Sequence, residues 1–126
     1  MKLVAASLMM ALAVAPIPAF AHGERPQATH GGDVQDAQGF WVELVVKASD
    51  VTVYVLSEDH KVIPAQQISG TATVLIDGKS YKVELSPGEA NSVQGKLPVP
   101  ATGRLVATVA LKVGGKPASA RFMGAA

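Results

Sequence analysis

The sequence of 126 residues contains no cysteine. This absence excludes disulfide bonds, thiolate metal sites, cysteine nucleophiles and a lipidated cysteine behind a leader segment. Methionine is also scarce: after the first ten residues the sequence contains only Met123. We therefore do not expect a thioether site for Cu(I). A small chain without cross-links has to be stabilised by its own hydrophobic core.

Net charge is small as well. Eleven basic residues stand against ten acidic ones, and without Lys2 the two numbers are equal. A balanced chain has no general attraction for polyanions. We therefore expect no nucleic acid among the partners of this protein.

Only one long hydrophobic run occurs, and it lies between Leu3 and Val14. Lys2 before the run and the small-x-small segment Ala19–Ala21 after it are typical of a secretory signal peptide. The run is shorter than the roughly 20 apolar residues of a membrane-spanning helix, and Pro16 follows it. We expect residues 1–21 to be cleaved off after Ala21, which leaves a periplasmic protein without membrane insertion.

The rest of the chain divides into residues 22–38 and residues 39–126. The first part is polar and contains three glycines, which predicts a flexible arm with at most a short strand near Asp33–Gln35. The second part consists of short β-branched runs separated by turn residues. Asp77-Gly78 lies between two such runs and predicts a hairpin with a type I′ turn. The expected strands are Phe40–Lys47, Val51–Leu56, Thr71–Ile76, Lys79–Leu85, Val93–Leu97, Arg104–Val113 and Ala118–Phe122.

This strand spacing predicts an all-β fold. We expect a single antiparallel β-sandwich of immunoglobulin-like type with about seven strands, in preference to a closed barrel. In the run Phe40–Lys47, alternation places Val42 and Leu44 on the core face and Trp41 and Glu43 on a mixed face. Trp41 and Tyr54 then either form an exposed binding face or are buried between two sheets.

Patterns of catalytic residues are missing from the sequence. No serine lies in a Gly-x-Ser-x-Gly elbow, and the glycines fall at turns rather than in a loop that would hold phosphate. We expect a protein that is not an enzyme, with no catalytic residues and no organic cofactor.

The histidines are more informative. After cleavage at Ala21, His22 is the first residue, and its α-amine and imidazole Nδ1 would chelate one ion in a way that suits Cu(II). His30 lies eight residues further along the same arm, with Glu24 and Asp33 as oxygen ligands. The alternative is that the arm histidines are only solvated side chains. We interpret His60, in a polar loop, as a turn residue.

Parts of the chain resemble small periplasmic proteins of bacteria that combine a signal peptide, a His-Gly-Gly segment and one β-sandwich. The resemblance covers Thr29–Leu97 and is carried by His30-Gly31-Gly32, Glu43–Val46, Val51–Leu56, Pro64 and Gly70–Val74. Those proteins are associated with heavy-metal efflux and copper resistance, so the resemblance implies a role in metal homeostasis.

A narrower similarity links His22 to copper carriers of the copper-resistance C type, whose mature first residue is a histidine that binds Cu(II). The present sequence lacks the later Asp-x-His pair of those carriers, which argues for a weaker site completed by His30 or for no site at all.

We therefore expect a non-enzymatic periplasmic protein that binds Cu(II), or Zn(II) or Ni(II), through His22, His30, Glu24 and Asp33. Its partners would be metal-efflux components of the cell envelope. The alternative is an interaction or structural module of the envelope that binds no metal and docks through a strand edge or through the face of Trp41.

Overall fold

The computed structural model describes residues 24–125. The predicted signal peptide and His22 lie outside these residues. Within the described range, no helix has the length and hydrophobicity needed to cross a membrane.

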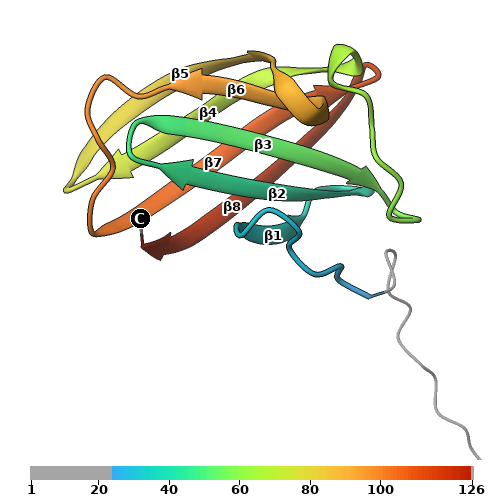
Figure 1. Cartoon of the computed structure of the whole chain (residues 1–126), viewed down its shortest axis with the longest axis horizontal. Coiled ribbons are helices and arrows are strands. Elements are labelled where there is room, and N and C mark those ends of the chain that lie inside the picture. The colour runs from blue at the N-terminus through green and yellow to red at the C-terminus, as the bar shows by residue number, and fades with distance from the viewer. Residues whose placement is uncertain (1–23, 126) are drawn as a thin grey trace, which may run out of the picture.

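Eight antiparallel strands make up the fold (Figure 1). Two short 3-10 helices, η1 (Ala65–Gln67) and η2 (Glu89–Asn91), interrupt the connections between them. The strands are β1 (Asp33–Asp36), β2 (Phe40–Lys47), β3 (Asp50–Ser57), β4 (Ile68–Ile76), β5 (Lys79–Pro87), β6 (Ser92–Lys96), β7 (Arg104–Val113) and β8 (Lys116–Ala125).

The strands form one sheet in the order β1-β2-β3-β6-β5-β4-β7-β8. The sheet curls on itself, so that β2 and β3 cross in front of β7 and β8, and the result is nearly a closed barrel (Figure 1). The predicted all-β antiparallel class is confirmed. The finer prediction of about seven strands in an immunoglobulin-like sandwich is not confirmed, because β6 pairs with both β3 and β5 and thereby joins all eight strands.

The predicted hairpin is also confirmed. β4 and β5 pair from Gly70↔Leu85 to Ile76↔Lys79, and the two residues between them, Asp77 and Gly78, have φ angles of 50° and 79°. Two consecutive positive φ angles are the property of a type I′ turn, and Asp-Gly adopts them at low cost.

The core fills the inside of the curled sheet. Alternate residues of every long strand point inward, and valine dominates because β-branched side chains pack well on a pleated surface. On β2 the inward residues are Val42 and Leu44, as the alternation predicts, with Phe40 and Val46 packed at the periphery. Buried apolar side chains from each of the strands β3 to β8 complete the core.

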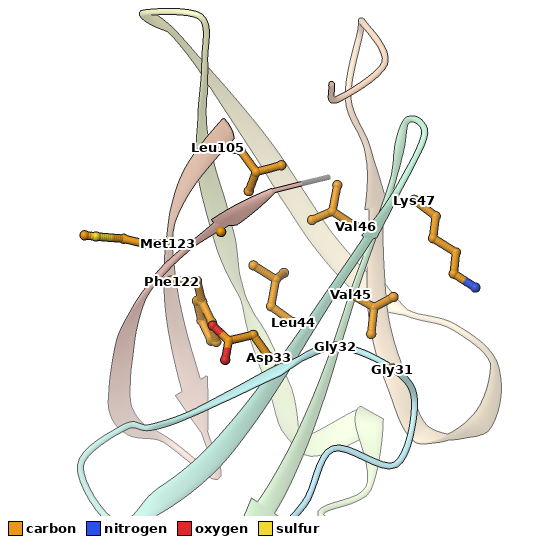
Figure 2. A pocket seen from close by; sticks show the side chains of 11 residues that line it. Gly31, Gly32, Asp33, Leu44, Val45, Val46, Lys47, Leu105, Phe122 and Met123 are labelled. Atoms are coloured by element: carbon orange, nitrogen blue, oxygen red, sulfur yellow. The ribbon is translucent and has the colours of Figure 1, made fainter. Parts of the chain in front are cut away.

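The two ends of the strand order, β1 and β8, come close to each other at a place that we call the seam. Because β1 is short, it pairs with β2 only from Trp41 to Leu44. The last residues of β2, from Val45 to Lys47, have no partner in β1. A hollow of about 360 Å³ lies at the seam, with Leu44, Leu105 and Phe122 around it (Figure 2). Closure is therefore incomplete on this side of the molecule.

Candidate functional site

Residues 24–32, which we call the strap, precede β1 in the chain and lie across the outer face of β1, β2 and β3. The strap and this outer face together line a small cavity of about 30 Å³. The site described below lies where the strap meets Glu43 on β2.

Glu43 is a buried carboxylate on the outer face of the sheet. Register places it between Val34 of β1 and Tyr54 of β3. Its Oε2 accepts hydrogen bonds from the backbone N–H groups of His30 (3.0 Å) and Gly32 (2.9 Å), and its Oε1 lies 2.9 Å from Nδ1 of His30. All three partners belong to the strap, so this one carboxylate holds the strap on the sheet.

Burial by itself raises the pKa of the Glu43 carboxyl. The hydrogen bonds from the His30 side chain and from the backbone of Gly32 and His30, together with the electrostatic interaction with the His30 ring, outweigh burial and lower the pKa below its ordinary value. Glu43 is therefore ionised at neutral pH. An ionised carboxylate only accepts hydrogen bonds, so the proton between Glu43 and His30 resides on Nδ1 of His30.

The imidazole of His30 is fixed on two sides. Glu43 holds Nδ1, and the ring of Tyr54 stacks on the imidazole with 3.5 Å between ring centroids and an interplanar angle of 2°. The His30 side chain is 39% exposed, against 8% for Glu43. In the neutral imidazole, Nε2 then carries the lone pair on a ring that is partly open to solvent.

Two further contacts hold the strap. The Arg25 guanidinium donates through Nη1 to the carbonyl oxygen of Val34 at 2.9 Å. At the far end, Nε2 of His60 lies 3.0 Å from the carbonyl oxygen of Glu24, and the His60 ring meets Trp41 edge to face at 6.3 Å. His60 lies in a turn, as predicted, but it also contacts the strap.

Trp41 and Tyr54 occupy neither of the two positions predicted for them. Both side chains lie on the outer face of the sheet, outside the main core, and line the cavity beneath the strap. Trp41 is only 5% exposed. The strap thus forms a second, smaller layer on this side of the sheet.

The predicted metal ligands are not brought together within the described residues. Asp33 begins β1, and because neighbouring strand residues point to opposite faces, it borders the seam hollow whereas Val34 faces the strap. Glu24 lies at the His60 end of the strap. Among residues 24–125 no group of three or more histidine or acidic side chains is arranged to hold a metal ion.

The contact between His30 and Glu43 is one that structural ion pairs and metal-binding histidines share. A histidine that binds a metal through one ring nitrogen usually donates the other N–H to a carboxylate or a carbonyl, which fixes the tautomer and the ring orientation. Glu43 is such a carboxylate for Nδ1 of His30. Within residues 24–125, this arrangement supplies one oriented imidazole and no group of three metal ligands.

The importance of Glu43 did not emerge from the sequence, because its partners lie 11 and 13 residues away and two of them are backbone groups. One signal was available: a single acidic residue between Trp41 and Val45 on a strand face, downstream of a His-Gly-Gly segment.

The chain matches no protein-family model, no curated protein and no solved structure.

Proposed function

We propose that this protein is a non-enzymatic periplasmic protein that binds a divalent transition metal, Cu(II) first and Zn(II) or Ni(II) after it. It would serve as a carrier or accessory in heavy-metal efflux or resistance. The observation that carries the proposal is the pairing of His30 with Glu43, which commits Nδ1 and leaves Nε2 as the donor atom.

His22 supplies the remaining donors in this proposal. Cleavage after Ala21 would free its α-amine, whose pKa near 8 allows a metal to displace the proton at neutral pH. Amine, imidazole and the Nε2 of His30 together give three nitrogen ligands, the donor type that tetragonal Cu(II) prefers. The spatial separation of Asp33 and Glu24 from His30 argues against both carboxylates as ligands of the same ion.

The resemblance to periplasmic β-sandwich proteins of metal-resistance systems is part of the same proposal. We also propose that the fold is of immunoglobulin-like type. This fold assignment is supported by the crossing of β2 and β3 over β7 and β8 with the core between them (Figure 1). The export route through a cleaved signal peptide, the periplasmic location and envelope efflux partners belong here as well.

Isothermal titration of the processed protein with Cu(II) tests the proposal. We expect one saturable site, lost in a His22→Ala, His30→Ala double variant and weakened in His30→Ala alone. Glu84→Ala is the matched control, since it removes an exposed carboxylate from β5, outside the strap and its contacts. Absence of saturable binding, or unchanged binding in the double variant, would refute the proposed function.

A second candidate is an envelope interaction module that binds no metal. The hollow at the seam favours it, because apolar side chains such as Leu105 and Phe122 contribute to its lining and the exposed Met123 borders it. Pull-down from envelope extract in the presence of a chelator separates the two candidates. A partner retained under those conditions, and lost on Met123→Glu, supports the interaction module.

A further inference from the structure

The seam contains an unfilled place for a strand between β2 and β8. Neighbouring strands are antiparallel along the whole strand order, so β2 and β8 run in the same direction and β1 lies between them, antiparallel to both. β1 has only four residues, whereas β2 has eight and β8 has ten. Beside Val45–Lys47 of β2 the row of β1 holds no strand of the described residues, and the hollow of about 360 Å³ lies there (Figure 2). We call this part of the row the gap.

On one side of the gap, β2 offers main-chain hydrogen-bonding groups. Near the start of β2, the N–H and C=O of Phe40 bond the C=O and N–H of Ala37 at 3.2 and 2.8 Å, on the side of β1. In an antiparallel ladder such an exchange recurs at every second residue. Val46 therefore directs its N–H and C=O into the row of β1, where no strand of the described residues pairs with it.

On the other side of the gap, β8 offers the same kind of groups. The N–H of Ser119 donates to the side chain of Gln38 across the seam, so every second residue counted from Ser119 directs its main chain to the seam. Met123 is one of these residues, and within the described range β8 pairs only with β7. An extended chain in the gap would thus meet free main-chain groups on both sides.

The side chains around the gap favour an extended chain with an apolar residue on its inner face. Leu44, Leu105 and Phe122 line the hollow toward the core (Figure 2). Proline is a common protection of free strand edges, but on β8 it occurs only at Pro117, at the far end of the strand. The edge of β8 beside the gap carries Met123 instead, which is 63% exposed.

The charges at the gap favour an acidic occupant. Lys47 ends β2, and Arg104 lines a second hollow that shares Leu105 and Met123 with the first. Neither cation has an ion-pair partner among the described residues. Asp33 is the only acidic residue that lines the two hollows in this part of the chain, and it lies at the opposite end of the gap, where β1 begins.

We propose that the gap is a site for strand addition, in which an extended acidic segment of a partner protein pairs with Val46 and Met123 and completes the sheet. The acidic side chains of this segment lie beside Lys47 and Arg104. A second copy of the chain is a poorer occupant, because the edges of its own gap bring the same cations. The proposal rests on the second candidate function, the interaction module, and is independent of metal binding.

Titration of the isotope-labelled processed protein with a short synthetic peptide, followed by NMR, tests the proposal. The probe is Glu-Val-Thr-Val-Glu with both ends blocked. We expect saturable shifts of the amide signals of Val46 and Met123, together with slower hydrogen exchange of these two amides. The peptide Lys-Val-Thr-Val-Lys should bind more weakly. A Glu peptide with N-methylated valines lacks main-chain donors and should not bind.

Met123→Pro removes the N–H that faces the gap, at an edge position where a strand tolerates proline. Met123→Ala is the matched control, because it removes the side chain and retains this N–H. We expect the Glu peptide to bind Met123→Pro about 2- to 12-fold more weakly than Met123→Ala, which corresponds to one main-chain hydrogen bond. Far-UV circular dichroism verifies that both variants are folded.

Lys47→Glu tests the charge at the gap and should reverse the preference between the Glu and Lys peptides. Lys116→Glu is the matched control, since Lys116 is an exposed lysine at the far end of β8 and should leave the preference unchanged.

Absence of binding at millimolar peptide, or equal affinity of Met123→Pro and Met123→Ala, would overturn strand addition. Equal affinity for the Glu and Lys peptides would overturn the acidic occupant. A dimer that protects the amides of Val46 and Met123 would assign the gap to a second copy and overturn the partner protein. If Met123→Pro still retains an envelope partner in the presence of chelator, the interaction module stands and only its assignment to the gap fails.

Discussion

Replacing Glu43 by alanine removes the acceptor of three hydrogen bonds at once. A hydrogen bond to a charged group contributes about 1.5–3 kcal/mol, so three of them set an upper limit near 9 kcal/mol. The released donors lie on the strap and regain water, and the variant no longer buries a charge, which reduces the loss. We expect a decrease of about 2–3 kcal/mol in the free energy of unfolding.

Urea denaturation followed by far-UV circular dichroism measures this change, and thermal unfolding should show a decrease of about 10–20 °C in Tm for a domain of this size. Glu84→Ala is the matched control, because Glu84 is an exposed glutamate on β5 and should change stability by less than about 0.5 kcal/mol. Equal, small effects of the two substitutions would refute the assignment of Glu43 as the anchor of the strap.

Three other expectations concern pH, packing and processing. Because the pKa of Glu43 is lowered on folding, its stabilisation is fully present above the unfolded carboxyl pKa of about 4.3 and is lost as the pH falls through the lower folded value. Urea denaturation between pH 6 and pH 3 should therefore show a steeper loss for the parent than for Glu43→Gln; parallel curves would contradict this. Val53→Ala should cost about 2 kcal/mol because Val53 is 0% exposed, whereas Val62→Ala, at 59% exposure, should cost little by the same assay. The mass of the secreted chain should correspond to a start at His22, and a start at any other residue would remove the chelating amine from that histidine.

Local pattern was enough to predict much of the fold. The alternation in Phe40–Lys47 places both the limits of β2 and its core face correctly, because a half-buried strand has to alternate apolar and polar positions. Asp77-Gly78 likewise predicts its hairpin, since the turn conformation is a property of these two residues.

Long-range pairing was beyond the reach of the sequence pattern. Whether β6 joins β5 depends on the two-residue contact of Ser86 and Pro87 with Gln94 and Val93, and no local signal encodes a contact of this kind. The predicted sandwich and the observed single sheet differ chiefly in this junction.

For the candidate site, the sequence names His30 as a possible ligand but not the contacts that hold its ring, and metal binding stays a prediction. His30 was singled out for its imidazole, and the structure gives it the carboxylate partner that a ligating histidine usually has. Glu43 was assigned only to a mixed face, because its role arises from a strap that folds back over β2. Its backbone donors, the N–H groups of His30 and Gly32, leave no trace in side-chain chemistry.

The incomplete closure of the sheet has a consequence for how the molecule opens. In a continuous ring every strand is paired on two sides, whereas β1 and β8 are each paired on one side and are expected to separate first, at the lowest free energy of local unfolding. Across the seam, the Gln38 side chain accepts a hydrogen bond of 2.7 Å from the backbone N–H of Ser119. β1 is the shorter of the two terminal strands, and the strap continues directly from it. The segment that presents His30 therefore belongs to the cooperative unit that separates from the rest with the least disruption.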